Sequence, residues 1–375
     1  MERRNIIIKW LNKVPSVKTF LIWLIFQSSG LKRLRLICYQ FYFFLGNTQF
    51  FLSKSHGILK KNPTVKSIIF LLPKYVCVKN LYELSQELVL CFKELYPDIL
   101  VECIYFYEDE SLDDKKTYLK RIITANPSHF VYLYGPHPLT CKQMQDFLPK
   151  IDSYKIIIAT DSIVMGDSYF LNIIKNDVDM IVGLDAPLRF RSRNSKLIGP
   201  IPSVISQHTF ERLIQPNLSI SRDIDILIAG FKYRKRLDIA NYLQNNGQKV
   251  TMIGGESGNT RMSYDQYFLI SCRAKIRIVT LTAYDELHVH MKGHIAEAVA
   301  TASLLFVDFL YPITNFFEEG KEFIRFASMK ELLEKVKWYL SNDEERIKVS
   351  MAAHRRWIEE YSGGKLWENI FSQSL

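Results

Sequence analysis

One stretch of the chain places a single carboxylate inside a small, apolar helical pattern. Residues 292–308 read KGHIAEAVATASLLFVD, in which Glu297 follows Gly293 and His294 and the pattern then continues into a strand. The alanines allow a helix to pack closely on a sheet, and burying a carboxylate there costs free energy unless it has a partner. A ligand hydroxyl is a suitable partner. This pattern therefore favours a site in which Glu297, Gly293 and His294 contact a sugar or ribose.

A second candidate site follows a predicted strand in the C-terminal half. Residues 230–236 read GFKYRKR, so Gly230 ends the strand and Lys232, Arg234 and Arg236 stand where a helix begins. Free backbone N–H groups, the helix dipole and guanidinium groups all favour a phosphate at such a place. The spacing is not G-x-G-x-x-G, so the dinucleotide-binding fingerprint is absent. A solvated basic turn is the alternative interpretation.

The elements that must position these residues are two series of short apolar strands alternating with helices. Continuous apolar strands of this kind indicate parallel sheets that are covered on both faces. The first series is Ser67–Leu72, Ile99–Phe106, Phe130–Tyr134, Lys155–Ala159 and Asp179–Leu184, and the second is Asp225–Ala229, Lys249–Ile253, Ile276–Leu281 and Leu304–Phe309. The predicted helices are Asn80–Leu95, Leu112–Ala125, Leu139–Phe147, Tyr169–Lys175, Lys235–Gln244, Tyr264–Ala274, a helix from about Gly293 to Ala302, Met329–Leu340 and Asp343–Tyr361.

We therefore predict an α/β protein with two Rossmann-like domains that face a cleft. The first domain spans residues 67–205 and the second spans residues 206–360, with an irregular, proline-containing crossing at residues 185–221. Residues 361–375 are predicted to cross back to the first domain. Ligands of tandem domains of this type bind at the carboxyl ends of the strands.

Two residues of the first domain are candidates for catalysis. Asp161 follows the predicted strand Lys155–Ala159, and His137 follows the strand Phe130–Tyr134. A general base for an acceptor hydroxyl belongs at such strand ends, provided that it faces the cleft. Asp185 stands in a comparable place. Capping of a helix or turn is the alternative role for an Asp after a strand.

From Asp223 to the C-terminus the chain resembles the CgeB-like glycosyltransferases, a GT-B-fold group related to the group-1 glycosyltransferases. The matching features are Ile224–Arg236, Ser263–Val279, Gly293–Asp308, the run FEEGKE at residues 317–322, and the closing pair Met329–Leu340 and Asn342–Ile358. The resemblance implies that Glu297 holds the ribose hydroxyls of a nucleotide sugar and that Lys232, Arg234 or Arg236 meets its pyrophosphate. It also implies that cations, rather than a bound metal, stabilise the leaving diphosphate.

The chain departs from the family pattern at three positions. His294 stands where the family commonly has Arg, and Ala302 stands where the helix commonly ends in Gly. Val289 occupies the position of a second Glu that related retaining enzymes carry eight residues before the ribose Glu. These departures leave the donor and the retaining or inverting outcome open, and they are also compatible with a member of low activity.

Three histidines lie close together near the candidate carboxylate. His288 and His290 form an H-x-H pair, and His294 follows four residues later. Such a pair on an extended segment can bind zinc. No Cys is near, and Asp285 and Glu286 fall in a predicted loop, so we expect no metal here. A contact of His294 with a phosphate or sugar hydroxyl, or a purely structural role, are the other interpretations.

The net charge of +10 is concentrated near the N-terminus. Residues 1–66 hold 12 Lys and Arg against one acid, Glu2, and the rest of the chain is close to neutral. Aromatic residues alternate with cations over residues 1–53, which suits a segment that lies in the interface of an anionic membrane. The apolar runs are shorter than a spanning helix needs. A helical extension packed on the first domain, and a true span, are the alternatives.

Composition and cysteine usage narrow the functional classes further. A protein that binds the phosphate backbone of a nucleic acid needs basic residues beside its cleft. The near-neutral charge of residues 67–375 therefore argues against a nucleic-acid partner and against a transferase acting on DNA. The six cysteines form no C-x-x-C pair, which favours free thiols in a reducing, cytoplasmic compartment.

The interpretation that accounts for most of these features is a metal-independent GT-B glycosyltransferase that needs no cofactor. It would pass a sugar from a nucleoside diphosphate sugar to a hydroxyl of a glycan, lipid-linked or protein acceptor, on the inner face of the membrane. A non-catalytic nucleotide-sugar-binding or assembly protein, and a sugar-nucleotide epimerase, are the alternatives.

Overall fold

The computed structural model describes residues 64–74, 83–107, 111–134, 139, 141–160, 174–184, 195–254, 262–282, 289–310 and 312–372. The chain divides into two compact units, residues 1–54 and 55–375, and all of the described residues belong to the second unit. The predicted membrane-surface segment, residues 1–53, lies outside the described residues. Among the helices that are described, none has both the length and the apolar character needed to cross a membrane.

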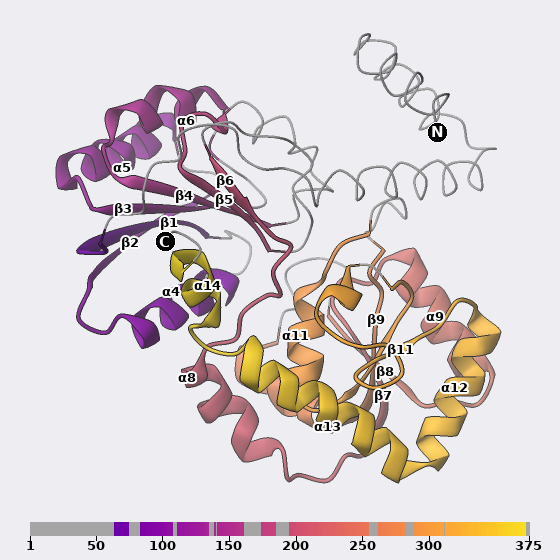
Figure 1. Ribbon diagram of the computed structural model, residues 1–375. Coiled ribbons are helices and arrows are strands. Elements are labelled where there is room, and N and C mark those ends of the chain that lie inside the picture. Colours follow the sequence, from indigo (N-terminus) through magenta and orange to yellow (C-terminus); the bar gives the residue numbers. More distant parts are fainter. Residues whose placement is uncertain are drawn as a thin grey trace, which may run out of the picture. The chain divides into compact units, whose positions relative to one another are not determined.

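The N-terminal half forms a parallel sheet (Figure 1). Its strands follow the order β2-β1-β3-β4-β5-β6, and every neighbouring pair is parallel. The bounds are β1 (Ser67–Lys74), β2 (Leu100–Tyr107), β3 (His129–Tyr134), β4 (Tyr154–Ala159), β5 (Met180–Gly183) and β6 (Lys196–Ile198). Strands β3, β4 and β5 are buried along almost their whole length, as expected for a sheet with both faces covered.

Helices cover both faces of this sheet. Helices α5 (Leu112–Ala125) and α6 (Cys141–Phe147) lie on one face, and α4 (Glu83–Leu95) lies on the other beside the last helix, α14 (Lys365–Ser372). The side chain of Trp367 on α14 is fully buried, and its indole N–H donates to the backbone oxygen of Leu88 at 2.9 Å. Helix α14 therefore packs against α4 on this face of the sheet.

The C-terminal half forms a second parallel sheet with the order β11-β10-β9-β7-β8. The bounds are β7 (Ile224–Ala229), β8 (Val250–Ile253), β9 (Ala274–Val279), β10 (Leu304–Val307) and β11 (Ile324–Arg325). Alternate residues of the strands join two different cores. One core lies under α9 (Arg234–Asn245) and α12 (Met329–Ser341), and the other lies under α10 (Tyr264–Cys272), α11 (Gly293–Ala300) and α13 (Asp343–Glu360).

The segment between the sheets is held by carboxylates of α4. A short helical stretch begins at α8 (Gln207–Thr209), with Ser206 as its N-cap. Glu87 accepts from the backbone N–H of Ser206 at 2.5 Å and from the hydroxyl of Thr209 at 2.6 Å. Glu94 accepts from the backbone N–H groups of Gln207 and His208 at 3.0 and 2.8 Å. These bonds satisfy N–H groups that a helix start leaves without intrahelical partners.

The prediction of an α/β protein with two parallel sheets is confirmed, and several element bounds were wrong. Helix α10 ends at Cys272 instead of Ala274, because Ala274 already pairs with Ile224 in the sheet. Helix α11 ends at Ala300 instead of Ala302, and β10 ends at Val307. Strands β6 and β11 were not predicted, since three and two residues are too short to show a pattern. Most of the predicted helix Tyr169–Lys175 lies outside the described residues.

Candidate functional site

Gly230 allows two side chains from different helices to meet at the end of β7. Its φ is +102°, a left-handed conformation that favours glycine. A Cβ atom at this position would overlap Nη1 of Arg236 and Nε2 of His294. Arg236 comes from α9 and His294 from α11, so the missing side chain lets both polar groups approach the strand end. Gly230, Arg236 and His294, all predicted from the sequence, are therefore brought together.

Arg236 is a buried cation that no described carboxylate neutralises. Its side chain is 4% exposed, its guanidinium lies 4.7 Å over the ring of Tyr233, and its Nη1 donates to the backbone oxygen of Phe231 at 3.0 Å. Its Nε atom has no hydrogen-bond partner among the described residues. Burial lowers the pKa of this guanidinium. An uncompensated buried charge is costly, so an anionic ligand that reached Arg236 would be strongly favoured.

Glu297 on α11 has a hydrogen-bond network of its own, which reaches His294 from the side opposite Arg236. Its Oε2 atom accepts from Nη2 of Arg277 at 2.5 Å, from Nδ1 of His294 at 2.7 Å and from the hydroxyl of Tyr267. The side chain is 19% exposed, and no described residue is recorded as donating to Oε1. One carboxylate oxygen is thus anchored, which leaves the other to accept from a ligand hydroxyl.

The electrostatics of Glu297 favour its ionised form. Burial alone would raise the pKa of this carboxyl group, but His294 and Arg277 hold it well below its usual range. The pKa of His294 is lowered, chiefly by burial and also by the nearby cations, although Glu297 opposes this effect. At neutral pH the site therefore contains an ionised carboxylate and a neutral imidazole, with two guanidinium groups close by.

Arg277 and Tyr267 belong to the site although the sequence analysis missed them. Arg277 lies on β9 with a side chain that is 0% exposed, and Tyr267 lies on α10. Within the described part of the chain, Glu297 is the one carboxylate paired with Arg277. A signal existed in the sequence, because Arg277 interrupts the apolar strand AKIRIV. A charge in the middle of a buried strand requires a charged or polar partner.

A second cation near the strand ends is already neutralised. Nζ of Lys235 lies 2.5 Å from Oδ2 of Asp308 and 2.6 Å from the hydroxyl of Thr282. The other oxygen of Asp308 accepts from the backbone N–H of Leu281 at 2.7 Å. These bonds tie the start of α9 to the residues that follow β9 and β10. Lys235 therefore serves the architecture of the site, in contrast to Arg236.

The other predicted residues of the second domain lie apart from this convergence. The side chain of Arg234 is 73% exposed and lies 3.7 Å from Asp238 on the next turn of α9. Lys232 is partly exposed. Gly293 is the first residue of α11, and a Cβ atom there would lie 3.5 Å from the hydroxyl of Ser203, which is an ordinary contact. The buried face of α9 thus distinguishes Arg236 from the two other cations.

The predicted catalytic residues of the first domain lie outside the described residues. This holds for Asp161, His137 and Asp185, and also for His288 of the histidine group. His290 is buried, and its backbone N–H donates to Leu281 O at 3.0 Å. Among the residues that are described, no group of three His, Cys, Asp or Glu side chains is placed to hold a metal ion.

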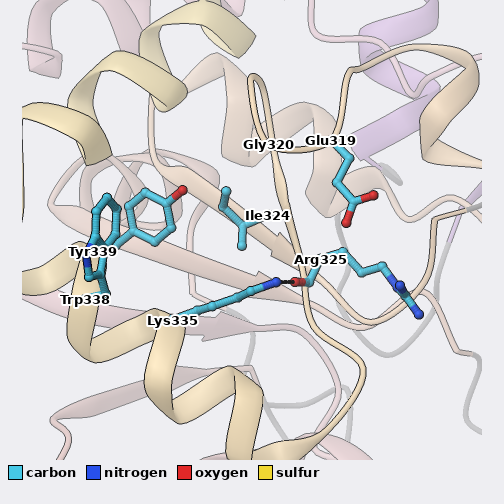
Figure 2. Close-up of a pocket in the computed structure, with 7 residues that line it drawn as sticks. All are labelled: Glu319, Gly320, Ile324, Arg325, Lys335, Trp338 and Tyr339. Carbon is cyan, nitrogen blue, oxygen red and sulfur yellow. Dashed lines mark hydrogen bonds between the residues drawn. The ribbon is translucent and has the colours of Figure 1, made fainter.

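A separate cavity of about 300 Å³ lies between β11 and α12. Figure 2 shows the exposed Trp338 beside Tyr339, and the amine of Lys335 directed at the backbone oxygen of Arg325, 2.7 Å away. The same amine lies 2.7 Å from Glu331. These contacts satisfy Lys335, and the cavity contains none of the predicted site residues.

Comparisons with known proteins connect this architecture to glycosyl transfer. Residues 211–372 match a protein family described as "Glycosyl transferase-like". No sequence among the curated proteins matches the chain. Similar solved structures include sucrose-phosphate synthase from Thermosynechococcus elongatus, which is 9% identical with a TM-score of 0.55 over 82% of this chain and 100% of that one.

Two further structures show the same likeness. HepE of Anabaena, solved with UDP and glucose, is 10% identical with a TM-score of 0.54 over 83% of this chain and 100% of its own. A glycosyltransferase of Rickettsia africae is 11% identical with a TM-score of 0.55 over 83% of this chain and 98% of its own. At such identities the likeness concerns the fold, and it confirms the predicted GT-B architecture. The family match identifies residues 211–372 as a glycosyltransferase domain and confirms the prediction of a glycosyltransferase.

Proposed function

We propose that the protein transfers a sugar from a nucleoside diphosphate sugar to a hydroxyl group of a glycan, lipid-linked or protein acceptor. The finer placement among the CgeB-like enzymes is part of this proposal. The observation that carries it is the buried Arg236, which has no carboxylate partner among the described residues. It lies on the Nε2 side of His294, and Glu297, held through one oxygen, lies on the Nδ1 side. A ligand that joins an anion to a hydroxyl-bearing ring matches both groups.

The roles follow from the chemistry of each group. Arg236 contacts the diphosphate and stabilises the negative charge that develops on it as the bond between the sugar and the diphosphate breaks. Oε1 of Glu297 accepts a hydrogen bond from a ribose hydroxyl, while Arg277 and Tyr267 hold Oε2 in place. HepE, which shares the fold, has been solved in complex with UDP-glucose, and we propose a ligand of that class here.

The acceptor side of the proposal rests on sequence alone. We propose that Asp161 or His137 removes the proton from the acceptor hydroxyl, because each follows a strand of the first sheet. The basic, aromatic residues 1–53 would hold the enzyme at an anionic membrane surface, where lipid-linked acceptors reside. Salt-sensitive binding to phosphatidylserine vesicles that disappears when residues 1–53 are removed is the expected result, and equal binding by both chains would contradict it.

The test of the donor site is a binding panel of nucleotide sugars, read by thermal stabilisation and calorimetry. A ligand at one hundred times its Kd stabilises the native state by about 2.7 kcal/mol. Loss of charge-assisted hydrogen bonds from Arg236→Met is expected to weaken binding by about 1.5–3 kcal/mol, roughly 10- to 150-fold. Arg234→Met, two residues earlier and exposed, is the matched variant and should bind almost as wild type does.

Two outcomes would overturn the proposal. The first is a folded wild-type protein that no nucleotide sugar stabilises, which would leave a scaffold without a donor site. The second is a nucleotide sugar that binds equally well to wild type and to Arg236→Met. Binding without transfer to any acceptor would instead favour the non-catalytic alternative.

A further inference from the structure

The two ring nitrogens of His294 face different groups. Nδ1 lies 2.7 Å from Oε2 of Glu297, 3.1 Å from the hydroxyl of Tyr267 and 3.3 Å from Nη2 of Arg277. Nε2 lies on the other side of the ring, where a Cβ atom at residue 230 would overlap both it and Nη1 of Arg236. The imidazole thus stands between the anchored carboxylate and a buried guanidinium that no described carboxylate neutralises, with 25% of its side chain exposed.

Hydrogen-bond chemistry assigns the proton of the neutral ring. The ionised Glu297 can only accept at Oε2, so Nδ1 carries the hydrogen in that contact. A neutral imidazole has one N–H group, and Nε2 is therefore an unprotonated acceptor. Both Nε2 and the cation of Arg236 adjoin Gly230, and an acceptor lone pair there would repel a phosphate oxygen.

The charges around the ring explain why it is neutral in the free protein. Arg236 on α9 and Arg277 on β9 disfavour a third positive charge, while Glu297 on α11 favours it and Tyr267 on α10 is uncharged. Burial adds to the effect of the cations and lowers the pKa of His294. A phosphate bound to Arg236 would reverse this balance, because its negative charge would neutralise the cation nearest Nε2.

We propose that donor binding is coupled to the uptake of one proton by His294, which then donates from Nε2 to a phosphate oxygen that Arg236 also binds. The proton comes from solvent and returns to solvent when the diphosphate leaves, so no bond other than N–H changes. The inference rests on the proposed function, since it assigns this place to the donor diphosphate. An arginine at the same position would provide a permanent charge and no such coupling.

Linkage gives the size of the effect. Where His294 is neutral in the free protein and protonated in the complex, the logarithm of the association constant falls by one for each pH unit. The expected Kd therefore rises about tenfold per pH unit between pH 7 and pH 8. Diphosphate diesters such as UDP-glucose, ADP-glucose and GDP-mannose carry a constant phosphate charge over this range, so a pH dependence of their binding reports on the protein.

The experiment is calorimetry of the full-length protein with these three compounds between pH 6.5 and 8.0. Each titration is performed in two buffers of different ionisation enthalpy, which counts the protons taken up per ligand bound. We expect about one proton near pH 7.5 for wild type. For His294→Arg and His294→Gln we expect none, with the pH dependence of Kd largely abolished. The control is His208→Gln, an exposed histidine of the α8 segment, which should behave as wild type.

The outcomes separate this inference from the function on which it rests. If a compound binds wild type with no proton uptake and no change of Kd with pH, the inference fails and the donor site stands. If uptake persists in His294→Gln, another group takes the proton and the inference also fails. If none of the three nucleotide sugars binds at any pH, both the inference and the proposed donor site are refuted.

Discussion

Replacing Glu297 by alanine is expected to lower the free energy of unfolding as well as to weaken ligand binding. The reason is Arg277, whose side chain is 0% exposed and whose Nη2 lies 2.5 Å from Oε2 of Glu297. Removing one partner of a buried ion pair leaves an uncompensated charge and typically costs about 3–5 kcal/mol. Because Glu297 is itself 19% exposed, water can reach the vacated space, and we expect a loss at the lower end of that range.

The variant Glu297→Gln separates the contribution of the negative charge from that of side-chain packing. Glu297→Gln keeps the volume and one oxygen that can accept from Arg277, but it removes the negative charge. Since a hydrogen bond to a charged group is worth about 1.5–3 kcal/mol, Gln should retain part of what Ala loses. Glu297→Gln is therefore the proper variant for donor-binding experiments, because a failure of Glu297→Ala to bind could reflect unfolding.

A double-mutant cycle measures the coupling directly. Arg277→Met removes the buried cation while it keeps an apolar chain of similar length. In the presence of Arg277→Met, the further change Glu297→Ala should cost at least 1 kcal/mol less than it does in wild type, because the charge it would strand is absent. The free energy of unfolding is obtained from urea titrations monitored by circular dichroism and by fluorescence, whose transitions must coincide.

A more exposed ion pair, which also has its cation on β9, provides the control. Lys275 on β9 lies 2.6 Å from Asp225 on β7, and both side chains are about one quarter exposed. Asp225→Ala should cost no more than about 1 kcal/mol, as for other solvent-accessible pairs. If Glu297→Ala costs as little as Asp225→Ala, or if the cycle is additive within about 0.5 kcal/mol, the reasoning from burial of Arg277 is refuted.

Three further predictions concern backbone conformation and acid stability. Gly230→Ala should abolish nucleotide-sugar binding and cost more in urea stability than Gly247→Ala, since both have positive φ but only Gly230 would meet other side chains. Ala302→Gly should leave stability unchanged or raise it by up to about 1 kcal/mol, because Ala302 has φ of +51°, and a clear loss would contradict this. Above pH 4.5 the depressed pKa of Glu297 contributes stability that is lost as the pH falls below that value, so acid titrations of Glu297→Gln should show a smaller loss than wild type.

Local patterns were sufficient for the residues that stand close together in the chain. Glu297 and His294 share one helix, and Gly230 and Arg236 share one strand-to-helix turn. The choice among the three cations of that turn could also have been made from spacing. Ile239, Ala240 and Leu243 follow Arg236 at three, four and seven residues, which places Arg236 on the buried face of α9.

The partners of Glu297 could not be predicted in the same way. Tyr267 lies on α10 and Arg277 on β9, so their meeting with Glu297 depends on the order in which strands and helices pack. The position of Arg277 within an apolar strand predicts a buried charge. The neighbouring sequence does not predict which carboxylate is its partner. The two shortest strands, β6 and β11, were missed because their pairing comes from neighbours rather than from their own residues.

The three departures from the family pattern have different physical consequences. Ala302 lies beyond the end of α11 in a left-handed conformation, where its N–H donates to Val299 O at 3.1 Å, so this change concerns the helix end. Val289 is buried and forms an isolated bridge with Thr282, so no carboxylate is available there. His294 instead keeps a polar group between Glu297 and Arg236. Under the proposal of proton uptake, a titratable group stands at the proposed diphosphate position, where an Arg would be permanently charged. The expected consequence is a donor affinity that depends on pH, and the calorimetric experiment with His294→Arg tests it.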